Sequence, residues 1–156
     1  MALHHRLIGK LARGYWMVRR PSSKGVRALV LDGADRVALV KHTYLPDWYL
    51  PGGGVKRREA FGAALARELR EEIGLADFRM ERILGIYSNG SEHKDDHVAI
   101  FVVRTLTPAA EIRAADRFEI EAAQWFALDA LPADISPASL RRIEEWRKGE
   151  TGLGDW

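Results

Sequence analysis

The sequence predicts an α/β domain, in which strands are flanked by helices. Two observations favour this class: several short apolar runs are bounded by turn residues, as is typical of strands, and residues 60–73 are strong helix formers that end at Gly74. With 156 residues, 47% of them hydrophobic, and no internal repeat, the chain fits one domain over residues 1–156.

The first half of the chain predicts a β-hairpin followed by a loop and a helix. Residues 26–31 and 36–41 have strand character and flank the turn residues 32–35. A short apolar piece, residues 48–50, then leads through Pro51 into a glycine run. The predicted helix follows that run directly.

The second half predicts three further strands and a last helix. We expect strands at 78–87, 97–104 and 123–128, with a polar loop at 88–96. Ser136 or Ser139 caps a helix that runs to about residue 148. At the two ends we expect an amphipathic helical extension over residues 1–20 and a flexible, frayed tail over residues 151–156.

The most informative pattern is a set of three carboxylates on the predicted helix. Glu68, Glu71 and Glu72 stand at i, i+3 and i+4, so they project from one side of the helix within about one 5.4 Å turn. Like charges at this spacing destabilise a helix unless something neutralises them. Carboxylates without Cys or His suit a hard cation, so we expect Mg²⁺ or Mn²⁺ here, shared with a substrate phosphate.

The alternative is that these glutamates form a solvated helix face, as most charge clusters do. Two observations argue against it. An apolar stripe lies beside the carboxylates, which places them at the edge of a packed face; its members are Phe61, Leu65, Leu69 and Ile73. The glycine run at 52–54 also brings bare backbone to the start of the helix, where it can approach a metal or phosphate closely.

These residues resemble the Nudix box. The pattern Gly53-x5-Glu59-x7-Arg67-Glu68-Leu69-x-Glu71-Glu72-x-Gly74-Leu75 fills every fixed position of that motif. The flanks, Leu50-Pro51 before the box and Gln124-Trp125-Phe126 after it, are also similar to Nudix domains, and the resemblance covers about residues 26–131. It implies an α/β/α sandwich in which the box helix lies against a mixed β-sheet.

The resemblance also implies a chemistry: Mg²⁺- or Mn²⁺-dependent hydrolysis of a nucleoside diphosphate linked to another group. By position, Glu68, Glu71 and Glu72 would bind the metal, Glu68 would also be a candidate base, and Gly52 would offer its carbonyl. Glu59 and Arg67 would brace the loop against the helix. The substrate stays open among ADP-ribose, another sugar nucleotide and an oxidised nucleoside triphosphate, with an RNA 5′ end disfavoured by small size and modest charge.

One departure from the family pattern lies just before Glu59, where many relatives carry glycine and this chain carries Arg58. Either Arg58 adopts a left-handed conformation at a cost, or the loop is reshaped. Its neighbours Lys56 and Arg57 are candidates for attracting substrate phosphates, although a solvated basic loop is the simpler interpretation.

Residues outside the box offer further candidates. Glu119 or Glu121 could supply an additional carboxylate to the metal or water, and Trp48, like Tyr49, could stack on a purine, although core packing is the default for such aromatics. Three histidines are more simply structural than catalytic: His42, His93 and His97.

Composition excludes several functions. The chain has no cysteine, which rules out disulfides, thiolate zinc sites and a cysteine nucleophile. A net charge of +2 gives no nucleic-acid footprint, and no apolar run reaches the roughly 20 residues of a membrane span. We therefore expect a cytoplasmic enzyme with a small-molecule nucleotide substrate, and a homodimer is possible. The alternative function is a catalytically silent Nudix domain that acts as a nucleotide sensor or interaction module.

Overall fold

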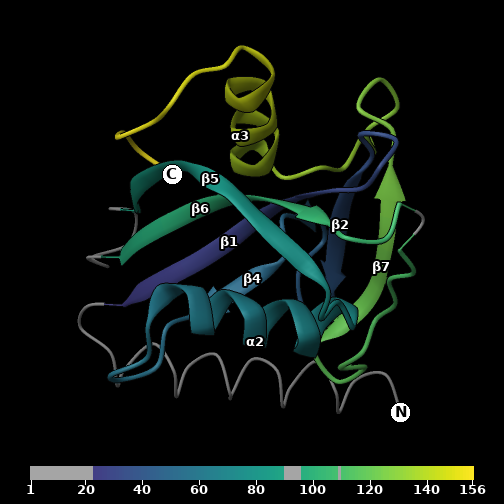
Figure 1. Ribbon diagram of the computed structural model, residues 1–156, viewed down its shortest axis with the longest axis horizontal. Helices are drawn as coiled ribbons and strands as arrows, with labels where there is room; N and C mark the ends of the chain where they lie inside the picture. The colour runs from purple at the N-terminus through teal and green to yellow at the C-terminus, as the bar shows by residue number, and fades with distance from the viewer. Residues whose placement is uncertain (1–22, 90–95, 109) are drawn as a thin grey trace.

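The computed structural model describes residues 23–89, 96–108 and 110–156 (Figure 1). The predicted helical extension at residues 1–20 lies outside them. The strands are β1 (Lys24–Leu31), β2 (Val37–His42), β3 (Trp48–Tyr49), β4 (Gly52–Gly54), β5 (Phe78–Asn89), β6 (Asp96–Thr105) and β7 (Ile120–Phe126). The helices are α2 (Phe61–Ile73) and α3 (Pro137–Arg147).

The strands form one mixed sheet. Its main order is β3-β2-β1-β6-β5, with β4 paired to β1 and β7 paired to β2. The β1–β6 pair is parallel along its whole length, and the other pairs are antiparallel. The predicted α/β class is confirmed.

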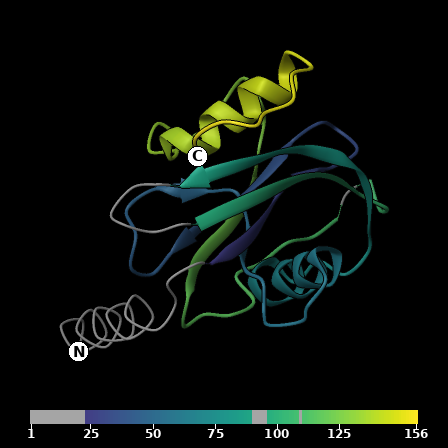
Figure 2. The ribbon, with the colours of Figure 1, turned by 90° about the vertical axis from the view of Figure 1, so that its left-hand side faces the viewer.

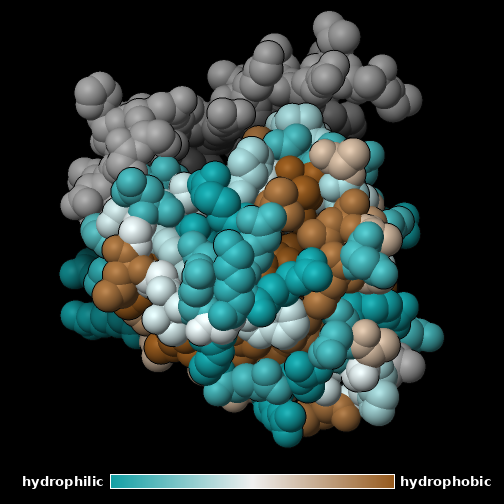
Figure 3. Space-filling view, turned by 90° about the horizontal axis from the view of Figure 1, so that it is seen from above, coloured by the Kyte–Doolittle hydropathy of each residue, from teal (hydrophilic) through white to brown (hydrophobic). Residues whose placement is uncertain are grey.

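The two helices cover opposite faces of the sheet (Figures 1 and 2). Alternation along β1 builds both cores, because Val26, Ala28 and Val30 pack with the buried part of the α2 stripe, which is Leu65, Leu69 and Ile73. The fourth stripe residue, Phe61, is exposed. Leu29 and Leu31 point the other way and pack in the layer with Ile143 of α3. On the face of the molecule that carries α3, hydrophobic residues are exposed among hydrophilic ones (Figure 3). The result is an α/β/α sandwich.

Helix ends follow the predicted signals. Gly74 ends α2 in the left-handed region, at φ 68°, and its N–H donates to Arg70. Ser136, rather than Ser139, caps α3: its hydroxyl accepts a hydrogen bond from the Ser139 amide at 3.2 Å. In the described part of the chain, no helix combines the length and apolarity needed to cross a membrane.

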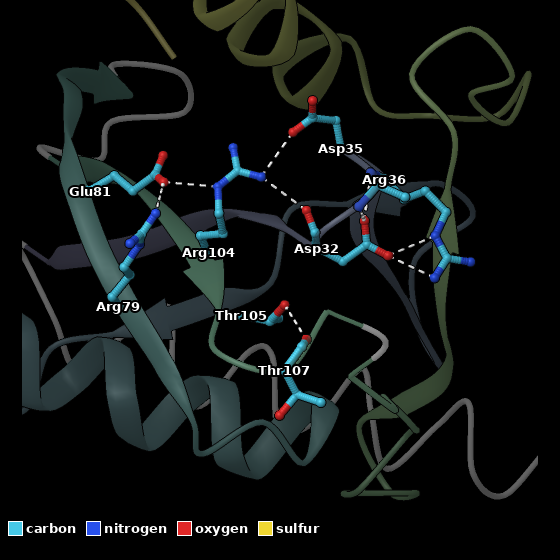
Figure 4. Close-up of polar contacts among 9 residues, drawn as sticks. Asp32, Asp35, Arg36, Arg79, Glu81, Arg104, Thr105 and Thr107 are labelled. Atoms are coloured by element: carbon cyan, nitrogen blue, oxygen red, sulfur yellow. Dashed lines mark hydrogen bonds and ion pairs between the residues drawn. The ribbon is translucent and has the colours of Figure 1, made fainter.

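The predicted hairpin is present but short. β1 and β2 pair only at Leu31 and Val37, and the buried Asp32 carboxylate holds the turn by accepting bonds from Ala34 and Arg36 (Figure 4). Arg104 of β6 donates to the Asp32 carbonyl, which ties the turn to the centre of the sheet. Below the turn, β1 pairs with the glycine strand β4 instead of β2. The loop before the helix is therefore part of the sheet.

The expectation of a frayed tail at residues 151–156 is wrong. The tail lies along β5 in parallel bridges, with Ile86 and Ser88 donating amide bonds of 3.0 and 2.9 Å to Gly152 and Gly154. Gly152 packs directly on the Tyr87 hydroxyl, where no side chain would fit. Arg142 of α3 also donates to the Asp155 carbonyl. These contacts order a segment whose glycines and charge indicate a loose end.

Candidate active site

The glycine strand β4 carries two positions at which a side chain cannot be accommodated without displacement. A Cβ on Gly52, whose φ is 145°, would lie 2.1 Å from the Val26 carbonyl oxygen of β1. A Cβ on Gly53 would lie 2.6 Å from the carboxyl carbon of Glu68. The glycines therefore let β4 join the sheet and let the Glu68 carboxylate approach the backbone.

Arg67 joins this loop to the helix. Its Nε and Nη2 donate to the two carboxylate oxygens of Glu59 at 2.8 and 2.9 Å, and Nη2 also donates to the Gly54 carbonyl at 2.9 Å. The bonds from Arg67, with one from the Lys56 amide, lower the pKa of Glu59 to about 2. The pair occupies a bracing position, as the resemblance implies.

The three helix carboxylates differ in environment. Glu72 is 5% exposed and accepts a hydrogen bond of 2.9 Å from the Gly52 amide. Burial raises the pKa of Glu72 to about 8, although the Gly52 bond and the charge of Arg27 oppose that shift. Glu68 lies 2.6 Å from Nη1 of Arg67, and the half-exposed Glu71 lies 3.3 Å from the same atom.

Among the residues that the structure describes, no three acidic or histidine side chains are already gathered as a metal site. Glu68 and Glu71 turn toward Arg67, whereas Glu72 turns toward Gly52. The donor set nevertheless fits a hard divalent cation, because it consists of oxygens only. A cation would also supply the positive partner that the buried Glu72 carboxylate needs in order to ionise at neutral pH.

A pocket of about 440 Å³ opens over these groups, which is a size that suits a nucleotide-like ligand. It is bounded by β1, the end of β2, the glycine strand, α2 and the turn before β7. Its lining residues are Arg27, His42, Tyr44, Leu45, Gly52, Gly53, Gly54, Lys56, Arg67, Glu68, Glu71, Glu72 and Glu119. A neighbouring, more open hollow of about 600 Å³ includes only Arg70 and Glu71 of α2, so the chemistry belongs to the first pocket.

Of the residues predicted outside the three helix carboxylates, some line the pocket and others do not. Lys56 and Glu119 line the pocket, whereas Arg57 and Glu121 do not. Trp48 as a stacking residue is wrong: its side chain is buried in the α3-side core, edge-on to Phe126 at 5.0 Å. In the pleated β3 strand, Trp48 and its neighbour Tyr49 point to opposite faces, and Tyr49 packs on the α2 side.

The departure at Arg58 resolves to the strained alternative. Arg58 has φ 63°, in the left-handed region that glycine adopts without a side-chain clash.

Sequence reasoning misses the pocket wall formed by the middle of β1 and the end of β2, where it expects only a structural role for His42. Arg27, on β1, donates to the Leu50 carbonyl at 2.6 Å. His42 is buried at the end of β2, followed by Tyr44 and Leu45 in the loop. The available signals were a charged residue inside an apolar strand and a histidine directly before a turn.

The acidic turn before β7 is hydrogen-bonded to the loop that follows β2. Thr43 donates its amide to the Glu119 carbonyl at 2.9 Å and its hydroxyl to the Phe118 carbonyl at 3.0 Å. Glu119 thereby faces the box helix across the pocket, and burial raises its pKa. Four carboxylates thus line one pocket.

Comparisons with known proteins agree on one family. The family model described as NUDIX domain matches residues 21–146. Diphosphoinositol polyphosphate phosphohydrolase 2 from Rattus norvegicus is 40% identical over 70 residues, which are 44% of this chain and 38% of that protein. A Bacillus subtilis protein named "Putative 8-oxo-dGTP diphosphatase" is 27% identical over 127 residues, 81% of each chain.

Solved structures share the fold. The MutT NUDIX hydrolase from Burkholderia pseudomallei is 28% identical with a TM-score of 0.61, over 79% of this chain and 96% of that one. A NUDIX hydrolase from Nitrosomonas europaea has a TM-score of 0.71 at 21% identity, over 86% and 78% of the two chains. The second likeness concerns the fold alone.

Proposed function

Because the chain belongs to the NUDIX domain family, we propose that it hydrolyses the pyrophosphate bond of a nucleoside diphosphate linked to another group, using Mg²⁺ or Mn²⁺ and water. The observation that carries the proposal is the convergence of Glu68, Glu71 and Glu72 on one nucleotide-sized pocket beside a glycine strand. The 40% identical relative is matched over only 38% of its length, so its activity is not transferred as a whole.

Glu68, Glu71 and Glu72 would hold the metal, with the Gly52 carbonyl as a further oxygen ligand. A bound divalent cation screens the charge of the non-bridging phosphate oxygens and makes a bound water more acidic. By its position in the Nudix box, Glu68 is the candidate base, and its carboxylate lines the pocket.

Arg67 and Glu59 position these carboxylates. Arg67 contacts both Glu68 and Glu71 while its other nitrogens are fixed by Glu59 and Gly54, so the guanidinium sets where the two carboxylates point. Lys56 and Arg27 supply positive charge at the pocket wall for the substrate phosphates.

The substrate classes that fit are ADP-ribose, another sugar nucleotide and an oxidised nucleoside triphosphate. To test the activity, the purified full chain is incubated with one member of each class, with Mg²⁺, with Mn²⁺ and with chelator. The proposal expects metal-dependent release of a mononucleotide from at least one of them. Chelator-resistant cleavage would contradict it.

A nucleotide sensor is the second candidate, favoured by one observation: Arg67 already contacts Glu68 and Glu71. Nucleotide binding without cleavage of any compound would support the sensor. Under the enzyme proposal, the same contacts orient the two carboxylates for the cation.

A further inference from the structure

We propose that the His42–Leu45 wall of the pocket is the subsite for the nucleobase of the substrate, a planar, uncharged, nitrogen-containing ring. This inference rests on the proposed function, since it assigns the part of the substrate that lies beyond the phosphates. It concerns residues outside the Nudix box.

The wall is aromatic, with the His42 ring in contact with the rings of Tyr44 and Tyr49. His42 lines the pocket with its ring centroid 5.3 Å from Tyr44 and 5.7 Å from Tyr49. Tyr49 packs behind it on the α2-side core, which fixes the back of the wall. Tyr44 stands at the mouth, 47% exposed, where its ring can stack on a flat ligand.

His42 carries a polar atom without a partner. The side chain is 5% exposed, and its Nδ1 has no hydrogen-bond partner among the described residues. Buried polar atoms in folded proteins are nearly always paired, so an orphan beside a ligand-sized pocket points to a ligand. Burial lowers the pKa of His42 to about 4, so the imidazole is neutral and suits an uncharged partner.

At one end of the pocket, α2 supplies three carboxylates, those of Glu68, Glu71 and Glu72. At the other end, His42, Tyr44 and Leu45 carry no carboxylate, and Glu119 lies beside them in the turn whose carbonyl accepts from Thr43. Arg27 acts on both ends, since its charge lowers the pKa of Glu72 and of His42. A diphosphate near Arg27 would therefore place its ring at the aromatic wall and its scissile bond at the carboxylates.

The number of charged side chains in the pocket lining also bears on the substrate class. The lining offers three strong cations, Arg27, Lys56 and Arg67, against four carboxylates. An inositol polyphosphate, like that in the name of the mammalian relative, carries many phosphates and no aromatic ring, and it would need a more basic pocket. A nucleotide, with few phosphates and one flat neutral ring, matches the lining.

The experiment separates the base from the phosphate. Isothermal titration of the full chain in Mg²⁺ compares AMP, GMP, CMP and UMP with ribose 5-phosphate, none of which contains a pyrophosphate bond. We expect at least one nucleotide to bind about tenfold or more tightly than ribose 5-phosphate. Tyr44→Ala should remove most of that preference and leave ribose 5-phosphate binding unchanged, whereas the matched Tyr44→Phe keeps the ring and the preference.

His42→Phe tests the hydrogen bond, because it keeps an aromatic ring and removes both nitrogens. It should narrow the differences in affinity among the four nucleotides. Equal binding of nucleotides and ribose 5-phosphate by the wild type would overturn the inference, as would equal weakening of both by Tyr44→Ala. Failure of the proposed function is separate, since it appears as no pyrophosphate cleavage by wild-type protein whatever the base preference. Thermal melting of each variant identifies a variant that does not fold, and for such a variant Tyr44→Leu or His42→Leu is measured instead.

Discussion

The backbone amide of Gly52 donates a hydrogen bond of 2.9 Å to the buried carboxylate of Glu72, twenty residues further along the chain. The bond joins the glycine strand to the last turn of the box helix. It satisfies one oxygen of a carboxylate whose ionisation is opposed by burial. The loop and the helix are thus coupled through the group that most needs a cation.

This coupling predicts a pH-dependent stability of the metal-free protein. The pKa of Glu72 rises from 4.5 to about 8 on folding, so the folded state holds its proton more tightly, and stability falls as pH rises through that range. Between pH 6.5 and 8.5 in chelator, we expect a loss of about 2 kcal/mol in the free energy of unfolding. Mg²⁺ should restore it at pH 8.5. Glu72→Gln should abolish the loss, and an unchanged pH dependence in that variant would contradict the assignment.

Gly53→Ala should separate activity from folding. The added Cβ meets the end of the flexible Glu68 side chain, which can move aside while the backbone stays. We expect the melting temperature to change little and hydrolysis to fall about tenfold or more. The control is Gly62→Ala, in helix α2, where nothing lies within 4 Å of the added Cβ. This control should add about 0.5–1 kcal/mol of stability. Equal activities of the two variants would argue against a precise role for Glu68.

Arg67→Lys should weaken the site without unfolding the protein. A lysine cannot make the paired bonds to Glu59 while also reaching Gly54 and Glu68. Activity should fall about 10–100-fold, as for other groups that orient metal ligands, with reduced Mg²⁺ affinity. Arg70→Lys, on the exposed side of the same helix, should keep the activity and the Mg²⁺ affinity of the wild type. Metal titration of both variants checks this.

Arg58→Gly should stabilise the protein. Glycine adopts the left-handed conformation at φ 63° without the Cβ clash, which is worth about 1 kcal/mol after allowing for glycine's larger unfolded entropy. Arg58→Ala removes the same charge but keeps the clash, so thermal melting of the two variants isolates the backbone effect. A melting temperature for Arg58→Gly no higher than that of Arg58→Ala would refute the strain.

Gly152→Ala should loosen the tail from β5. Its Cβ would lie 2.2 Å from the Tyr87 hydroxyl oxygen, so the ring or the tail must move. We expect a loss of about 1–3 kcal/mol and faster amide exchange at Ile86 and Ser88. Gly154→Ala has nothing within 4 Å of its Cβ and should leave both readouts near wild type.

The parts of the molecule that local patterns determine were predictable. The helix carrying Glu68, its stop at Gly74 and the cap at Ser136 depend on neighbours within a few residues, so the sequence indicates them directly. The glycine run before the helix, expected as a loop, is instead strand β4. For Arg58 the sequence left two alternatives open, and the structure has the left-handed one.

The remainder depends on long-range contacts. Trp48 lies in a two-residue strand, too short for alternation to show which face it occupies. Arg27 reaches the pocket because β1 pairs with the glycine strand, where Arg27 lies opposite Gly52, and His42 reaches it from the end of β2. Both positions depend on how distant strands pair. The tail pairs with β5 because Gly152 fits Tyr87, a contact across 65 residues that composition does not reveal.

The most direct test of the central claim is the rate of mononucleotide release by Glu71→Gln in Mg²⁺, beside wild type and Glu144→Gln. Glu71 is 53% exposed, so its substitution should not disturb folding, and Glu144 is an exposed glutamate on α3 far from the pocket lining. If the box carboxylates hold the metal, turnover falls about 100-fold in Glu71→Gln and stays at the wild-type rate in Glu144→Gln. Unchanged turnover in Glu71→Gln, with wild-type melting, would contradict the account.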